Sequence, residues 1–254
     1  MSSLVNHPIL TFAVTIVVLW LSSRVGAVLR ARRAEMDEEE RGEYGVLLTA
    51  MLTLLGLIIG FSFSMASSRY DQRKNLEEEE ANAIGTEYLR ADLLPADSAE
   101  KVRRLLRSYL DQRILFYTTH GDDQLRQINT TTAKLQLDLW DIVKAPAGSD
   151  RSAVEALTVS GMNDVLNSQG YTQAAWWNRI PIGAWGLMWA IAVCCNSMIG
   201  FYIRPKDPKK IQFLMPMVIA VAFLLLADID SPRRGIINVR PQNLISLVDS
   251  LGPR

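Results

Sequence analysis

The sequence has little of the side-chain chemistry that most enzymes and metalloproteins use. It contains two histidines and two cysteines, and Cys194 and Cys195 are adjacent inside an apolar run. Adjacent cysteines do not form an ordinary disulfide staple, and His7 and His120 do not have metal-ligand spacing. There is no glycine-rich phosphate loop, no nucleophile elbow and no CxxC pair. We therefore expect a protein that is not an enzyme.

An excess of charge of either sign is also missing. Lys and Arg together number 27, and Asp and Glu together number 27. A protein that binds nucleic acid normally shows a basic excess, so nucleic acid is not an expected partner. Ionisable residues are scarce inside the apolar runs, which argues against proton-coupled transport, because such transporters carry ionisable coupling sites there.

Long apolar runs are what the sequence does have. Four of them, at 9–29, 45–66, 182–203 and 211–227, are long enough to cross a bilayer as helices. The chain start, MSSLVNHP, lacks the positive charge of a signal peptide, and the basic RARR follows the first run instead, which predicts a retained anchor. The pattern indicates a multi-pass membrane protein whose surroundings include a lipid bilayer.

The polar region between the second and third runs shows helical spacing of its apolar residues, interrupted at Pro95 and Gly121, and no convincing alternating strand. The predicted fold class is therefore all-α, an integral membrane protein with four transmembrane helices and a helical extramembrane layer between the second and third. The predicted parts are 1–66 with the first two spans, 67–178 as the layer continuous with the second, 179–229 with the last two, and 230–254 as a docking tail.

The stretch 45–90 organises this arrangement. It passes from an apolar span into a charged segment without a proline, which predicts one helix that leaves the bilayer. Gly56 and Gly60 form a small-xxx-small pair, typical of a face that packs closely on a neighbouring helix, and such a face also suits a narrow aqueous path. Close packing is the default interpretation.

Which side of the membrane holds the helical layer is left open by the charges. The short connections RARR and RPKDPKK lie on one side and favour the cytoplasm for that side. Arginines and lysines flank the opposite ends of the spans in nearly equal number, so the rule does not decide.

Two segments resemble the bestrophin channels, and more closely the prokaryotic bestrophin-like branch. The run LLGLIIGFSFSMASSRYDQR and its continuation EEANAIGTEYLRADLLP are similar to the helix that leaves the membrane in that family. DIDSPRRGIINV is similar to the turn after the last span. The matching positions in the first run are Gly60, Phe61, Ala66, Arg69, Tyr70, Asp71 and Arg73. Lys74 and Asn75 stand where bestrophins have two aromatic residues.

The resemblance implies a homo-oligomeric channel of five subunits in a prokaryotic inner membrane, with passive flow of inorganic ions, anions by analogy, through a central pore lined by the second span. The pore-lining candidates are Gly56, Gly60, Phe61, Phe63, Ser64 and Ser67. Phe61 and Phe63 are two residues apart on a helix, so only one of them is expected at the axis. Each of them is equally open to a packing role, and the serine hydroxyls to bonding with helix carbonyls.

Two further groups of charged residues are candidate sites. Arg69, Arg73, Glu77 and Glu80 are candidates for a charge ring at the base of the span, and they also suit a solvated face with salt bridges. Carboxylates in such a ring favour cations, in conflict with the anions that the resemblance implies. Asp228 and Asp230 are candidates for a Ca²⁺ site, as in bestrophins, and alternatively cap the helix end and pair with Arg233 or Arg234.

A second function remains open from the sequence. A large polar helical region without an explicit selectivity filter is also typical of a non-conducting membrane scaffold or accessory protein whose helical layer binds a partner.

Overall fold

A computed structural model of the chain describes residues 7–33, 37–144, 153–202 and 209–252. The basic connection RPKDPKK lies largely outside these residues. Every regular element in the described part is a helix, and four helical stretches there are long and apolar enough to cross a membrane. The all-α fold and the multi-pass membrane character predicted from the sequence are confirmed.

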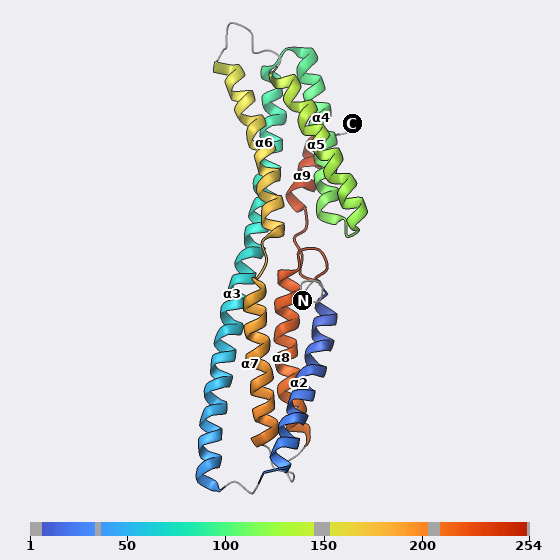
Figure 1. The fold of residues 1–254 in the computed structure, drawn as a ribbon. Helices are drawn as coiled ribbons and strands as arrows, with labels where there is room; N and C mark the ends of the chain where they lie inside the picture. The colour runs from blue at the N-terminus through green and yellow to red at the C-terminus, as the bar shows by residue number, and fades with distance from the viewer. Residues whose placement is uncertain (1–6, 34–36, 145–152, 203–208, 253–254) are drawn as a thin grey trace. The chain divides into compact units, whose positions relative to one another are not determined.

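The helices follow one another along the chain in the order shown by colour in Figure 1. They are α2 (Pro8–Ala31), α3 (Glu38–Arg90), the 3-10 turn η1 (Ala91–Leu93), α4 (Ala96–Thr118), α5 (Asp122–Lys144), α6 (Ala153–Trp177), α7 (Ile182–Tyr202), α8 (Lys209–Asp230) and α9 (Gln242–Ser250).

Helix α3 is one continuous helix of 53 residues, as the absence of proline from this stretch predicts. The α-helix ends at Arg90, five residues before Pro95, where the sequence predicts the stop. The reason is that residues 91–93 form the 3-10 turn η1 instead of a further α-helical turn. Pro95 itself is the residue that precedes α4. The chain divides into two compact units, and α3 contributes its first part to one and its last part to the other.

The first unit comprises residues 1–69 and 179–238. Within it α2 packs against both α7 and α8. The crossing of α2 and α7 depends on two glycines, because a Cβ on Gly26 would overlap the carbonyl oxygen of Ser197, and one on Gly200 would overlap that of Ser23. Small residues at such a crossing let helix backbones approach closely, which is how helices associate in lipid.

The second unit comprises residues 70–178 and 239–254. Its core is formed by the apolar stripes of α4, α5 and α6 together with the last part of α3 and the short helix α9. Phe116, Tyr117 and Trp176 meet there with ring centroids 5.1 to 5.6 Å apart in edge-on arrangements. Such aromatic pairs add about 0.5–1.5 kcal/mol each to the burial of their area, so they tie α4 firmly to α6.

Candidate pore-lining face

Helix α3 has one face that is buried within its own chain. At spacings of three, four and seven residues along the helix lie Leu55, Ser62, Ala66, Arg73, Glu77, Glu80, Ile84 and Glu87, each at most 3% exposed. Spacings built from threes and fours keep residues on one side of an α-helix. On this side the buried residues are Leu55, Ser62 and Ala66 in the first unit and, apart from Ile84, charged residues in the second.

The opposite face of α3 is exposed along its whole length. Its midline, which we call the outer stripe, consists of Thr53, Leu57, Gly60, Ser64, Ser68, Asp71, Asn75, Glu78, Asn82 and Thr86. Within the apolar span the stripe is made mainly of small and hydroxyl-bearing residues. Beyond the span it carries carboxylates and amides, with no lysine or arginine.

The pore candidates predicted from the sequence all lie on the exposed part of α3 except Ser67, which is half-buried. Gly60 and Ser64 belong to the outer stripe. No heavy atom lies within 4 Å of a Cβ built on Gly56 or Gly60, so neither glycine is a packing contact within the described chain. The close helix crossing found in the first unit uses Gly26 and Gly200 instead.

Phe61 and Phe63 flank the outer stripe on its two sides. They are 65% and 44% exposed, respectively. On an α-helix two residues at this spacing point about 160° apart. Phe61 lies beside Leu57 and Ser64, whereas Phe63 lies beside Gly60. Which of the two faces a pore remains a prediction.

Two of the four charge-ring candidates, Glu77 and Glu80, have their partners inside the second unit. Glu77 accepts the backbone N–H of Asn243 at 2.9 Å, its side-chain amide at 2.6 Å and the backbone N–H of Leu244 at 3.0 Å. A helix N-terminus has unpaired N–H groups and a partial positive charge, so a carboxylate there is favourable. Glu77 thus holds the start of α9.

Glu80 is the acceptor at the centre of a buried network. It pairs with the Arg113 guanidinium and accepts the hydroxyls of Tyr117 and Thr172, each at 3.3 Å. Arg113 also stacks over the Phe116 ring at 4.4 Å. Burial, reinforced by the Glu80 charge, raises the pKa of Tyr117, which keeps its hydroxyl protonated and able to donate.

The two arginine candidates also point into the chain. Arg69 lies 3.9 Å from Asp230, with its side chain 14% exposed, and Arg73 is buried in the second unit. The exposed acids Asp71 and Glu78, which belong to the outer stripe, were not among the charge-ring candidates predicted from the sequence. The signal that distinguishes Glu78 from Glu77 is the three-and-four spacing counted from Leu55, which passes through Glu77 and avoids Glu78.

Asp228 and Asp230 both accept backbone N–H groups, Asp228 from the turn that follows α8 and Asp230 from the segment that precedes α7. The Asp228 carboxylate accepts the backbone N–H groups of Ile236 and Ile237, both at 2.7 Å. Asp230 accepts the backbone N–H of Ile180 at 2.9 Å. Within the described residues no group of three or more His, Cys, Asp and Glu side chains is placed to hold a metal. The Ca²⁺ site stays a prediction, and this geometry uses the two carboxylates as caps.

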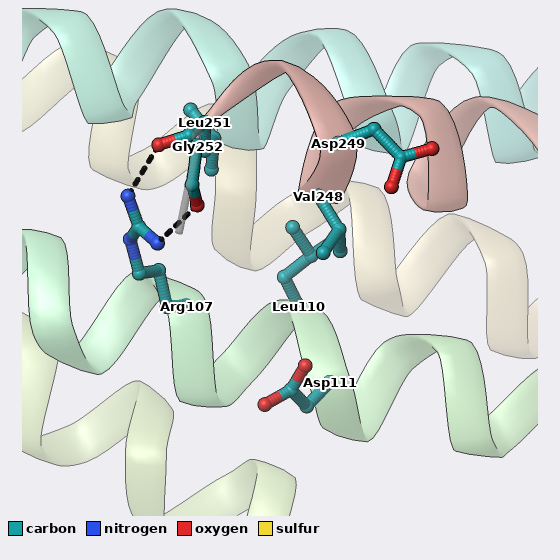
Figure 2. A pocket seen from close by; sticks show the side chains of 7 residues that line it. All are labelled: Arg107, Leu110, Asp111, Val248, Asp249, Leu251 and Gly252. Carbon is teal, nitrogen blue, oxygen red and sulfur yellow. Dashed lines mark hydrogen bonds between the residues drawn. The ribbon is translucent and has the colours of Figure 1, made fainter. Parts of the chain in front are cut away.

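The C-terminal helix α9 is also held at its far end. Arg107 of α4 donates to the carbonyl oxygens of Leu251 at 2.5 Å and Gly252 at 3.0 Å, and its guanidinium bonds the Tyr88 hydroxyl. Figure 2 shows Arg107 reaching across to these carbonyls beside a pocket of about 340 Å³. Three charged side chains, Arg107, Asp111 and Asp249, and three apolar ones line the pocket, and we assign it no ligand.

Comparison with known proteins agrees with this architecture. A family model described as a bestrophin-like domain matches residues 9–244. Crystal structures of a bacterial bestrophin homologue from Klebsiella pneumoniae have the same fold. One point variant aligns with a TM-score of 0.64 and 14% identity, over 95% of this chain and 99% of that one. The structure solved by Zn-SAD phasing aligns with a TM-score of 0.62 and 14% identity, over 93% and 98%.

No match was found among curated proteins. The family match covers nearly the whole chain, and the resemblance seen in two short segments of the sequence is thereby confirmed. The chain belongs to the bestrophin-like family.

Proposed function

We propose that the protein is an oligomeric, passive ion channel in which α3 from each copy lines a central pore. The observation that carries the proposal is the outer stripe. This face of the span turns Thr53, Gly60 and Ser64 away from its own chain. The Thr53 hydroxyl donates to the backbone carbonyl of Thr49 at 2.8 Å, so the helix itself satisfies that donor. Small side chains and hydroxyl oxygens on an outward face suit a water-filled axis surrounded by copies of α3 better than lipid contact.

The assembly proposed is a ring of identical subunits, five by resemblance to the family. In this arrangement Phe61 or Phe63 forms an apolar constriction next to the stripe, of the kind that closes a channel by expelling water. The second unit, with its soluble-type core, forms the helical layer outside the bilayer, and α3 carries the ion path into it.

The sign of the permeating ion depends on the charges near this path. Family resemblance implies anions. The outer stripe carries Asp71 and Glu78, and the exposed Lys74 lies beside both of them, three residues after the first and four before the second. Two carboxylates against one ammonium per copy leave a net negative ring, which raises the local concentration of cations. We therefore propose permeation by small inorganic ions in which these acids favour cations.

The test is current measurement on the full-length protein in planar bilayers. In a background in which Cys194 and Cys195 are replaced by alanine, Ser64→Cys is exposed to a membrane-impermeant thiol reagent. We expect the unmodified Ser64→Cys variant to conduct like the wild type. Modification of its cysteine should then remove at least half of the current. The matched control is Met65→Cys, which lies next to Ser64 and off the outer stripe, and whose current should not change.

Two results would contradict the proposal. If the wild-type protein forms an intact oligomer but passes no current in salt gradients of both polarities, it is not a channel. That result would favour the scaffold function. An equal loss of current in both cysteine variants would show that the outer stripe does not line the pore.

A further inference from the structure

Three span ends of the first unit meet at one place. The guanidinium of Arg234, after α8, lies 2.6 Å from the ring Nε2 of His7, which precedes α2. Asp230, the last residue of α8, accepts the backbone N–H of Ile180, just before α7. The end of α8 and the starts of α2 and α7 are therefore on the same membrane face.

Arginines gather at this junction. Arg179 precedes α7 and is close enough to interact electrostatically with Arg234 and Asp230. Arg233 is the neighbour of Arg234, and both lie in the turn after α8. Four arginines, Arg69, Arg179, Arg233 and Arg234, lie at this junction with two carboxylates, those of Asp228 and Asp230. Because the arginines outnumber the carboxylates, the junction carries a net positive charge.

The turn that carries Arg233 and Arg234 is held in shape. Both oxygens of Asp228 are bound by the N–H groups of Ile236 and Ile237. Gly235 lies so close to Asp228 that a Cβ there would overlap its carbonyl oxygen. The turn therefore closes on the helix end only with glycine at this position, and the path of its backbone is fixed.

Apolar side chains project from the same turn. Ile236 is 90% exposed and Ile237 is 39% exposed, although both belong to a tightly bonded loop. A large aliphatic side chain held outward at a span end fits the boundary between headgroups and acyl chains. Guanidinium groups beside it bind phosphate with paired N–H donors.

We propose that this junction, formed by Arg179, Arg233 and Arg234 with Ile236, binds the phosphate headgroup of an anionic phospholipid while Ile236 enters the acyl-chain boundary. The occupant is a lipid of the surrounding leaflet. Arg234 and Arg179 contact the phosphate, and the Asp228 cap keeps the turn in the orientation that presents them. The site lies within one unit and does not depend on ion conduction.

The experiment is native mass spectrometry of the full-length protein in detergent with phosphatidylglycerol or phosphatidylcholine added. We expect wild type to retain phosphatidylglycerol in preference to phosphatidylcholine by about tenfold, because the arginines attract an anionic headgroup more strongly than a zwitterionic one. Arg179→Gln with Arg234→Gln should remove the preference. The matched control is Arg126→Gln, an exposed arginine of the second unit, which should retain it.

A second variant separates a lipid from a soluble phosphate compound. Ile236→Ser removes only an exposed aliphatic chain, so it should fold, and it should lower phosphatidylglycerol retention severalfold. Excess glycerol phosphate should not displace the lipid. Unchanged preference in the double arginine variant, equal retention of both lipids by wild type, unchanged retention in Ile236→Ser, or full displacement by glycerol phosphate would each overturn the proposal.

Discussion

The backbone of Gly161 on α6 lies directly against the carboxylate of Glu87 on α3. A Cβ built on Gly161 would overlap Glu87 Oε2 and the guanidinium of Arg90. Glu87 is fully buried, and neither of its side-chain oxygens has a hydrogen-bond partner among the described residues. One glycine thus permits the approach of two helices that enclose a carboxyl group, and two predictions depend on it.

The first prediction concerns the lack of space for a side chain at Gly161. Gly161→Ala should lower the stability of the second unit by about 1–3 kcal/mol, because a methyl group there displaces Glu87 and Arg90 from a packed helix pair. Thermal unfolding of the detergent-solubilised protein measures this as a lower midpoint. Gly170→Ala is the control, since the same helix leaves open space at that position and alanine is the better helix former. An unchanged midpoint for Gly161→Ala would contradict the close approach.

The second prediction concerns the protonation of the Glu87 carboxyl group. Burial, with a smaller contribution from Asp164, raises the pKa of Glu87 to about 8, although Arg90 opposes the change. Because the folded state holds this proton more tightly than the unfolded state, stability from this group is fully present below about pH 4.5 and is lost as pH rises to about 8. The loss is about 1.4 kcal/mol for each pH step of one in this window.

Glu87→Gln removes the titrating proton while keeping the shape. We expect its unfolding midpoint to change much less than that of wild type between pH 5 and pH 9, so that the variant is the more stable protein at about pH 9. If the unfolding midpoints of the two proteins change equally with pH, Glu87 is not a buried acid.

A third prediction uses the capture of α9. Glu77→Ala should release the start of α9, because it removes the acceptor of three hydrogen bonds. Hydrogen bonds to a charged group contribute about 1.5–3 kcal/mol, so amide exchange in residues 242–250 should accelerate at least tenfold. Glu78→Ala, which changes the exposed neighbour, is the control and should leave the exchange rate unchanged.

A fourth prediction tests the buried ion pair of Glu80 and Arg113. Arg113→Met leaves the Glu80 charge uncompensated in the core, and removal of one partner of such a pair costs about 3–5 kcal/mol. Adding Glu80→Gln to Arg113→Met should recover a large part of that loss. Chemical unfolding of the single and double variants measures the difference, and losses that simply add would rule out the pairing.

A fifth prediction concerns ion preference. If the outer stripe faces the pore, Asp71→Asn with Glu78→Gln should shift the reversal potential in a salt gradient toward the anion equilibrium potential, because the only charges on the stripe are removed. Asp97→Asn, an exposed acid in the first turn of α4, should leave it unchanged. Conduction with unaltered selectivity would contradict the charge assignment while preserving the channel.

Local features of the sequence determined the framework. Whether a run of residues crosses a bilayer depends on its own length and apolarity, so the four spans were predictable from 9–29, 45–66, 182–203 and 211–227. The continuity of α3 was predictable for a similar reason, since no proline interrupts the stretch from Gly45 to Arg90. The short motifs at the two span ends were enough to indicate the family.

Only the tertiary structure decided what adjacent residues of one type do. Glu77 holds α9, Glu78 is exposed, and Glu80 pairs with Arg113, although all three belong to one acidic run. Likewise, Gly26 and Gly200 make the close helix crossing, whereas Gly56 and Gly60 remain open. The reason is physical: successive residues on a helix differ by about 100° in direction, and which direction is buried depends on neighbours that are distant in the chain.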